Sequence, residues 1–309
     1  MNDKMKGGIY GLLVGDALAR HYEFLSPEYM QNLLNIDMIP PHNHQRTYKE
    51  AKVGSWSDEG AMMLCMLNSL TIAHVFRADV YMKQLLAYRT QGLFAVDHVV
   101  FGCSRQFEQV MKAYQEGTKV YSCADVNPKC RDASALSRTL PLALYLTQNQ
   151  ADAKDFIKYG HAQTLLTHQQ LVAGICSTIY MQWARNIYLQ VKNPFVRALH
   201  TLLELYNEEC REIIAQQIIR RQGVTPLNDV VTCLMDAYTI VDKAENYHDA
   251  VMTAIKKGNQ TTALASAVGG IAGIKFGYQD IPTGWLNLLR ERDTIENLIK
   301  KYDMECVEK

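Results

Sequence analysis

The segment HQQLVAGICSTIYMQWARNIYLQ, residues 168–190, decides the fold class. Its apolar residues recur at every fourth position along one stripe: Leu171, Ile175, Ile179, Trp183 and Ile187. This spacing is typical of one face of an α-helix, whereas a half-buried strand would alternate apolar and polar residues. The same period recurs along almost the whole chain, and alternating patterns are nearly absent. The sequence therefore predicts an all-α protein.

Periodicity and turn residues together predict the helices and the number of domains. The expected helices span residues 4–19, 26–35, 58–75, 78–91, 99–115, 133–147, 153–163, 168–190, 194–206, 208–221, 228–241, 245–257, 261–276 and 285–302. The two longest loops are expected near residues 37–57 and 116–131. Length alone would allow two domains of about 150 residues each. No Gly/Ser linker, composition shift or short repeat divides the chain, so we expect a single compact domain over residues 1–309.

Composition excludes several classes of partner. The chain has 309 residues, with 32 Lys and Arg against 32 Asp and Glu. A chain without net charge lacks the basic excess that binding to nucleic acid requires, so no nucleic-acid partner is expected. No apolar run has the length and purity of a membrane span, so no membrane partner is expected either.

The cysteines and the first residues predict the compartment. The eight cysteines include no C-x-x-C pair, which favours reduced thiols in a cytosol-like compartment. Lys4 and Lys6 precede an apolar run, residues 7–14, that imitates a signal peptide. Asp16 and the shortness of the run favour a core helix instead. We therefore expect a cytoplasmic protein with no signal peptide or transmembrane segment.

Two expected helices contain rows of glycine. Gly7, Gly11 and Gly15 are spaced by four, and so are the glycines at 269, 273 and 277. Because each Gly costs a helix about 1 kcal/mol relative to Ala, such rows need a packing reason. We expect both helices to approach a neighbour closely. That neighbour is either another helix or a ligand to which the backbone lies close.

Two clusters of short oxygen-bearing side chains stand at expected helix starts. Ser57, Asp58 and Glu59 open one helix, and Asn259 to Thr262 open the glycine-rich helix near the C-terminus. Helix capping explains both clusters without any further function. The alternative is a site for a hard cation, because Mg²⁺ prefers oxygen ligands.

Six segments in a fixed order carry a resemblance to a known family. They are Gly15-Asp16-Ala17-Leu18 followed by Tyr22-Glu23-Phe24, then Gly54 to Glu59, Arg138 to Leu144, Thr167-His168, Gly258 to Thr262, and Ile281-Pro282 followed by Trp285-Leu286. In this order they resemble the ADP-ribosylglycohydrolase family, also called the dinitrogenase-reductase-activating glycohydrolases. The resemblance runs from about Lys4 to Leu289. It implies an all-α, single-domain fold whose cleft holds ADP-ribose above a two-metal magnesium cluster.

The resemblance also implies roles for individual residues. Glu23 corresponds to the gating or catalytic Glu, and Ser57, Asp58 and Glu59 to the first metal motif. The second motif, Gly-Gly-Asp-Thr-Asp-Thr, falls on residues 257–262, where Asn259 and Thr261 replace both aspartates and Lys257 replaces a Gly. The candidate metal ligands are therefore Ser57, Asp58, Glu59, Asn259 and Thr262, and the candidate catalytic residues are Glu23 and Asp58.

A second group of residues is expected to contact the substrate. The family's Asn-Gly-(Ser/Ala)-x-Met-Arg segment, which lines the nucleotide pocket, falls on residues 133–138 and keeps only its Arg. The substrate-binding candidates are Asp16, Ser134, Arg138, His168 and Gly258. For His168, which opens a long helix, a capping or core role is the alternative.

The number of carboxylates expected at the metal motifs leaves two functions open. Two Mg²⁺ ions carry four positive charges, but the metal motifs keep only Asp58 and Glu59, with Glu23 nearby. We expect at most one weakly held Mg²⁺, or none, with Lys257 as a substitute for the missing metal charge. The first function is hydrolysis or recognition of ADP-ribose attached to a protein side chain. The alternative is an inactive pseudoenzyme whose cleft binds ADP-ribose, another nucleotide or a protein partner.

Overall fold

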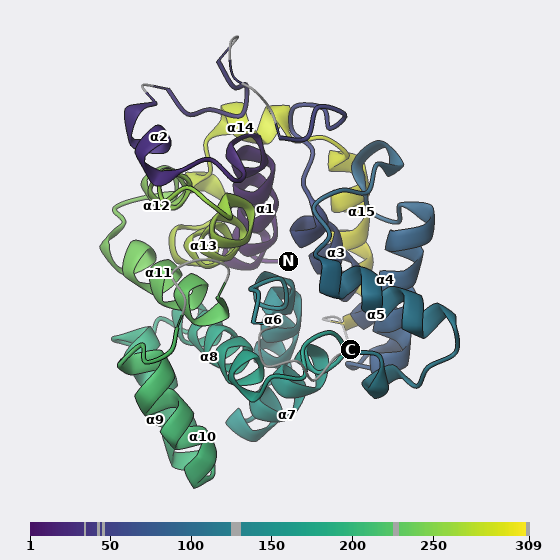
Figure 1. Cartoon of the computed structure of the whole chain (residues 1–309), viewed down its shortest axis with the longest axis vertical. Helices are drawn as coiled ribbons and strands as arrows, with labels where there is room; N and C mark the ends of the chain where they lie inside the picture. The colour runs from purple at the N-terminus through teal and green to yellow at the C-terminus, as the bar shows by residue number, and fades with distance from the viewer. Residues whose placement is uncertain (34, 42–43, 45–46, 125–130, 225–228, 307–309) are drawn as a thin grey trace.

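Two helices rich in small residues, α1 (Asp3–Ala19) and α13 (Thr261–Phe276), pack against each other backbone to backbone. A Cβ atom on Gly11 would lie 2.3 Å from the carbonyl oxygen of Gly269, and one on Gly273 would lie 2.0 Å from that of Gly7. Only glycine permits this approach, so the expected close contact of the glycine rows is confirmed. Figure 1 shows α1 and α13 side by side in the middle of the molecule.

The structure, a computed structural model, describes residues 1–33, 35–41, 44, 47–124, 131–224 and 229–306. Every regular element in this part of the chain is a helix, which confirms the all-α fold. The remaining α-helices are α2 (Pro27–Asn32), α3 (Asp58–Ala73), α4 (Ala78–Gln91), α5 (Arg105–Gln115), α6 (Leu140–Gln148), α7 (Ala153–Thr164), α8 (Leu171–Tyr188), α9 (Pro194–Leu205), α10 (Glu208–Ile213), α11 (Val230–Lys243), α12 (Tyr247–Lys256), α14 (Thr283–Leu288) and α15 (Arg292–Cys306).

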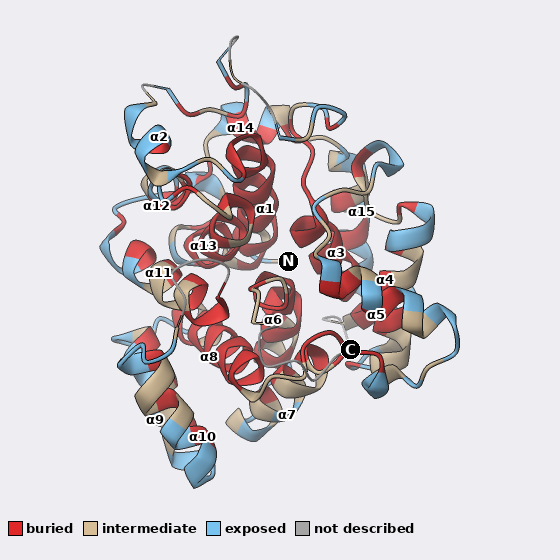
Figure 2. Cartoon of the chain, viewed as in Figure 1, coloured by how far each residue is buried: buried red, intermediate tan, exposed pale blue. Residues whose placement is uncertain are grey.

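The other helices enclose the central pair. The helix α13 also contacts α8, α11 and α12, and α3 contacts both members of the pair. In Figure 2 buried residues dominate α1, α3, α6, α8 and α13, whereas α2, α9 and α10 carry exposed faces. Within the described residues, no helix combines the length and apolarity needed to cross a bilayer. The expectation of a single domain over residues 1–309 stays a prediction.

Several expected helices differ in the structure. The helix expected over 133–147 begins at Leu140, because the Asp132 carboxylate accepts hydrogen bonds from the backbone and hydroxyl of Ser134 and turns the chain there. The helix expected over 285–302 is divided into α14 and α15, since Glu291 adopts a φ of 50° between them. The helix expected over 99–115 begins only at Arg105. Residues 214–219 continue α10 as a π-helix.

Two helix N-termini position the candidate site. At the start of α3, Asp16 of α1 accepts hydrogen bonds from the backbone N–H groups of Ser57, at 2.9 Å, and Gly60, at 2.8 Å. At the start of α13, the carboxylate of Glu23 accepts a 2.7 Å bond from the backbone N–H of Thr262. At each helix N-terminus, an acid from the N-terminal segment therefore accepts bonds from N–H groups that have no partner within the helix. These bonds fix both acids relative to α3 and α13.

Candidate active site

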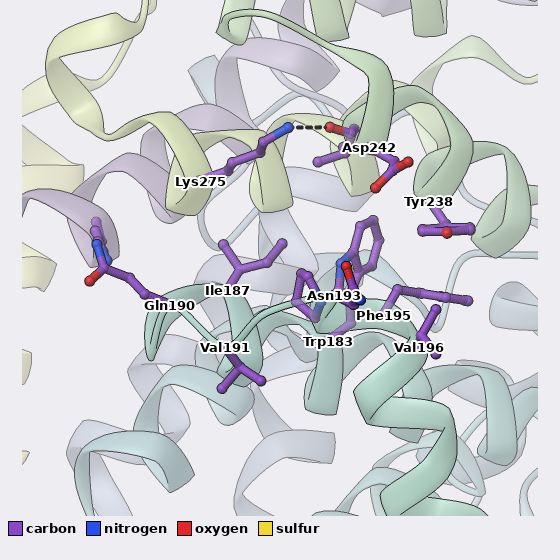
Figure 3. Close-up of a pocket in the computed structure, with 13 residues that line it drawn as sticks. Trp183, Ile187, Gln190, Val191, Asn193, Phe195, Val196, Tyr238, Asp242 and Lys275 are labelled. Carbon is purple, nitrogen blue, oxygen red and sulfur yellow. Dashed lines mark hydrogen bonds between the residues drawn. The ribbon is translucent and has the colours of Figure 1, made fainter.

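A cavity of about 400 Å³ beside α8, α9 and α11 has the wrong chemistry for catalysis (Figure 3). Its wall combines apolar side chains and the rings of Trp183, Phe195 and Tyr238 with several polar side chains. The Lys275 ammonium group donates a 2.6 Å hydrogen bond to the carbonyl oxygen of Val241. Asp242 is the one carboxylate among its described lining residues, so the cavity lacks the paired acids of glycoside hydrolysis.

A second cavity, of about 300 Å³, gathers four carboxylates, and we call it the acidic cavity. Glu23 comes from the segment after α1, Asp58 and Glu59 from the start of α3, and Asp132 from the segment before α6. The lining is completed by Phe24, Tyr48, Gly102, Cys103, Ser104, Ala133, Ser134, Gln260, Thr262 and Ala263. The candidate catalytic residues Glu23 and Asp58 therefore face one space together with Glu59 of the first metal motif. Ser57 does not line the cavity, and its hydroxyl donates to Asp16 instead.

Glu23 is held in place rather than free to move. Its carboxylate accepts hydrogen bonds from the Thr261 hydroxyl, at 2.8 Å, and from the Thr262 backbone N–H, at 2.7 Å. Its own carbonyl accepts a bond from the Thr47 hydroxyl. Burial raises the pKa of Glu23 to about 7, even though the bonds from Thr262 and Thr261 oppose this rise. Glu23 is thus a fixed carboxylate that titrates near neutral pH.

Asp58 and Glu59 are crowded by other acids. Burial raises the pKa of Asp58 to about 8, and repulsion from Asp16 and Glu23 adds to the rise. Burial and the Asp58 charge also raise the pKa of Glu59 well above its usual range, although a hydrogen bond from the Ser137 hydroxyl opposes this. A side chain at Gly102 would strike the Asp58 carboxylate, since a Cβ there would lie 2.5 Å from Oδ1.

Asp16 supports the cavity from behind. It is fully buried, and its carboxylate accepts bonds from the Ser57 backbone N–H, the Ser57 hydroxyl and the Gly60 backbone N–H. These three donors occupy the carboxylate, and Asp16 is not among the lining residues. The structure places this predicted substrate-binding residue as a support for the first metal motif.

Asp132 belongs to the cavity, although no motif in the sequence pointed to it. Its Oδ1 lies 3.0 Å from Nε2 of His168 and 2.5 Å from the Ser134 hydroxyl. Burial alone would raise the pKa of Asp132, but the His168 charge and the bonds from His168 and Ser134 outweigh it and hold the pKa below its usual range. Asp132 is therefore the acid of this cavity that stays ionised most readily.

His168 and Ser134 act on the cavity in different ways. Ser134 lines it directly. His168 is buried between Asp132 and the Thr167 hydroxyl, which lies 2.7 Å from Nδ1. His168 does not line the cavity but contacts the carboxylate of Asp132, which does, so its expected contact with substrate stays a prediction.

Arg138 lies away from the cavity in the core. It is fully buried, and its guanidinium donates to the Thr167 hydroxyl at 2.7 Å and to the backbone and side-chain oxygens of Gln163, both at 3.1 Å. Because these partners occupy the guanidinium, its expected contact with the nucleotide does not fit this position. It joins α7 to the segment before α6 instead.

The segment 257–259 faces a neighbouring cavity of about 190 Å³. Lys257 forms an ion pair with Asp236 there, at 3.4 Å, so its charge does not replace a metal among the acids. Gly258, with a φ of 70°, lets the backbone approach Leu25, because a Cβ there would lie 2.7 Å from the Leu25 carbonyl oxygen. Gly258 thus serves the chain's own packing at this point rather than lining the acidic cavity.

The donors of the acidic cavity fit at most one hard cation. Asp58, Glu59 and Thr262 offer the oxygen ligands that Mg²⁺ prefers. Asn259, a predicted ligand, lines the neighbouring cavity instead, and the Thr261 hydroxyl is bonded to Glu23. Among the described residues, no three His, Cys, Asp or Glu side chains lie close enough together to hold a metal ion. A two-metal cluster does not fit this arrangement, and a single weakly held Mg²⁺ stays a prediction.

Sequence reasoning also missed the aromatic part of the lining, Phe24 and Tyr48. The pattern Asp132-x-Ser134, typical of a side-chain-bonded turn, could have indicated that the chain bends at Asp132. Nothing in the sequence places Tyr48 in the cavity, because it lies within a long loop.

Comparisons with known proteins agree with this description. The sequence profile described as ADP-ribosylglycohydrolase matches residues 1–309. The chain is 24% identical over 305 residues to the ADP-ribosylarginine hydrolase Tri1 of Serratia proteamaculans, which covers 97% of this chain and 78% of that protein. It is 23% identical over 303 residues to the ADP-ribosyl-(dinitrogen reductase) glycohydrolase of Rhodospirillum rubrum, and this match covers 94% of this chain and 91% of that protein.

A solved structure described as an ADP-ribosylglycohydrolase-related protein complex shares the fold. It superposes with a TM-score of 0.77 over 98% of both chains, at 17% identity. At that identity the likeness speaks for the fold alone. Together with the profile match over the whole chain, it leads to one conclusion: this chain belongs to the ADP-ribosylglycohydrolase family.

Proposed function

We propose that this chain hydrolyses the glycosidic bond between ADP-ribose and a protein side chain, with arginine as the favoured acceptor. Family membership supports the reaction, and the relatives that act on ADP-ribosylarginine and on ADP-ribosylated dinitrogen reductase support a protein-linked substrate. The eight cysteines without a C-x-x-C pair support a cytoplasmic setting.

One observation carries the proposal: Glu23 and Asp58, from distant parts of the chain, line the same acidic cavity. Attack of water on the anomeric carbon needs a group that orients or deprotonates the water. A carboxylate with a pKa of about 7 suits that task at neutral pH, and Glu23 has this value because it is buried. We assign Glu23 the role of base and Asp58 that of a fixed group that orients water or the ribose.

The remaining carboxylates bind and orient. Asp132, kept ionised by His168, accepts hydrogen bonds from the leaving group or a ribose hydroxyl. When bound, a single Mg²⁺ would supply a Lewis acid held by Asp58 and Glu59. The other roles in the reaction belong to the side chains of Glu23, Asp58 and Asp132.

The test is release of ADP-ribose from an arginine peptide that carries it, in Mg²⁺ and in EDTA. Glu23→Gln keeps the size of the side chain and removes the base, so turnover should fall about 100-fold or more with little change in binding. Glu28→Gln, on the exposed face of α2, is the matched control and should keep full activity. Asp58→Asn should reduce turnover and also weaken any Mg²⁺-dependent binding.

Two outcomes would contradict parts of this assignment. Full activity of Glu23→Gln would show that another group is the base. If wild-type protein binds ADP-ribose by calorimetry but releases none from arginine- or serine-linked peptides, the chain is a binding protein. The pseudoenzyme alternative would then replace hydrolysis.

A further inference from the structure

Phe24 has an unusual backbone conformation beside the candidate base. It follows Glu23 directly and lines the acidic cavity. Its φ is 64°, in the left-handed region that a bulky residue without a special reason avoids. Its side chain is nevertheless 60% exposed. The chain thus accepts backbone strain to present an aromatic ring at the mouth of the cavity.

The conformation is enforced by the start of α13. The Phe24 backbone N–H donates to the Asn259 carbonyl at 2.7 Å, and the Asn259 N–H donates to the Leu25 carbonyl at 2.7 Å. Asn259 is also left-handed, with a φ of 60°, and Gly258 permits the close approach of the two segments. This reciprocal pair holds the backbone at Phe24 whatever side chain stands there.

Packing does not explain the choice of phenylalanine. A ring with 60% exposure buries little apolar surface, so it contributes little to stability. Glycine would adopt the same φ without strain. Strained residues at functional sites are held in place by the surrounding structure, and the benefit lies in what the side chain contacts.

The carboxyl groups of the cavity indicate what the ring contacts. Glu23, Asp58, Glu59 and Asp132 line the same space. Carboxyl oxygens accept the hydrogen bonds of a guanidinium, and an aromatic face attracts a cation. The Phe24 ring directly follows the candidate base Glu23 in the chain. A flat cation that stacks on this ring would therefore lie at the anomeric carbon, where the leaving group is, rather than at the nucleotide.

We propose that Phe24 is a specificity-determining residue whose ring stacks on the guanidinium of an ADP-ribosylated arginine. This inference rests on the proposed hydrolysis and adds the group that selects the acceptor side chain. The ring contacts the acceptor rather than ADP-ribose, so its effect falls on KM for arginine-linked substrate.

The experiment compares Phe24→Gly, Phe24→Leu and Phe24→Trp on two peptides, one ADP-ribosylated on arginine and one on serine. For arginine linkage, the Gly and Leu variants should raise KM about 2- to 30-fold, the range of a cation–π contact, with kcat nearly unchanged. Phe24→Trp should keep the wild-type KM. The serine-linked peptide, with a neutral leaving group, should respond to none of the three, and neither should the Kd of free ADP-ribose.

Stability separates this role from a structural one. Phe24→Gly relieves the strain, so its Tm should equal or exceed that of wild type. Gln150→Gly is the matched control, since Gln150 has a φ of 54° on the surface loop between α6 and α7. That variant should also keep its Tm, but with unchanged KM. A large fall in Tm for Phe24→Gly alone would show that the ring is a packing element.

Further outcomes distinguish a failure of this inference from a failure of the proposed function. Active wild type with an unchanged KM in Phe24→Gly, or an equal loss of ADP-ribose affinity, overturns the inference and leaves the hydrolase standing. If wild type lacks turnover, Kd values for the arginine-linked peptide and for ADP-ribose replace KM. A Phe24→Gly variant that raises the first Kd but not the second then supports the inference. Wild type that binds neither overturns both.

Discussion

The Thr261 hydroxyl lies 2.8 Å from Oε2 of Glu23, although 238 positions separate the two residues. The resemblance implies that position 261 corresponds to an Asp of the family's second metal motif. In this chain the residue at that position is a hydrogen-bond donor that holds the candidate base.

Removal of that donor should affect both stability and pH dependence. Thr261→Val leaves the buried Glu23 carboxylate with one fewer hydrogen bond, which should cost about 1–3 kcal/mol in unfolding free energy. Because the bond lowers the pKa of Glu23, its loss should raise that pKa further above 7. The acidic limb of the pH–rate profile should then move to higher pH.

Thr201→Val, which removes a hydroxyl bonded to the carbonyl of Arg197 on α9, is the control and should change neither quantity. A Thr261→Val profile that coincides with wild type would mean that Glu23 does not govern the acidic limb.

Stability without added metal should fall as pH rises. The pKa of Asp58 is about 8 in the folded chain, against about 4 for an unfolded Asp. Between these values the folded state binds more protons, so the free energy of unfolding decreases with rising pH, by up to about 1.4 kcal/mol per pH unit for each proton. Denaturant unfolding in EDTA from pH 5 to pH 8.5 measures this slope.

Asp58→Asn should flatten that slope because it removes a titrating group. Asp155→Asn on α7 is the control and should keep the wild-type slope. A wild-type stability that rises across this range would show that Asp58 is ionised with little penalty.

Restoring the second metal motif should create metal-dependent stability. In Asn259→Asp with Thr261→Asp, the new acid at 261 stands against Glu23, so the Tm in EDTA should fall. Mg²⁺ should raise the Tm of this variant more than that of wild type, because binding to the folded state alone is stabilising. Asn259→Asp alone, which faces the neighbouring cavity, should respond like wild type. If the double variant gains no Mg²⁺ response, residues 257–262 do not correspond to the metal motif.

Larger side chains in the glycine contact between α1 and α13 should destabilise the protein. Gly269→Leu and Gly273→Leu would drive side chains into the carbonyls of Gly11 and Gly7, so each should cost about 1–3 kcal/mol or more. Gly284→Leu on α14 is the control, since no atom lies within 4 Å of a Cβ placed there. Unchanged Tm values for both central variants would contradict the packing described for α1 and α13.

The sequence predicted most helices because their apolar faces repeat with the helical period, as in α8. It failed where side chains compete with the backbone, as at Asp132 and Ser134, or where a left-handed residue such as Glu291 divides an apolar pattern. These events depend on single residues and leave the period almost unchanged.

For the candidate site, the sequence located the acids but not their surroundings. Glu23, Asp58 and Glu59 follow from a resemblance in local motifs, and the structure brings them to one cavity. The burial of Arg138 depends on Gln163 and Thr167, which lie on another helix and in the turn after it. The orientation of Asn259 depends on its backbone pairing with Phe24 and Leu25. Such partners are distant in sequence, so no local pattern indicates them.

The contact between α1 and α13 has a consequence during synthesis. The Thr261 hydroxyl oxygen lies 3.0 Å from the Ala19 carbonyl oxygen, although 242 positions separate the two residues. At about 5–20 residues per second, a ribosome needs roughly 10–50 s to make the intervening chain. Throughout that interval α1 exposes an apolar, glycine-lined surface without its partner, and Glu23 lacks its donors. The acidic cavity can therefore form only after the start of α13 has been made, because Gln260, Thr262 and Ala263 line it.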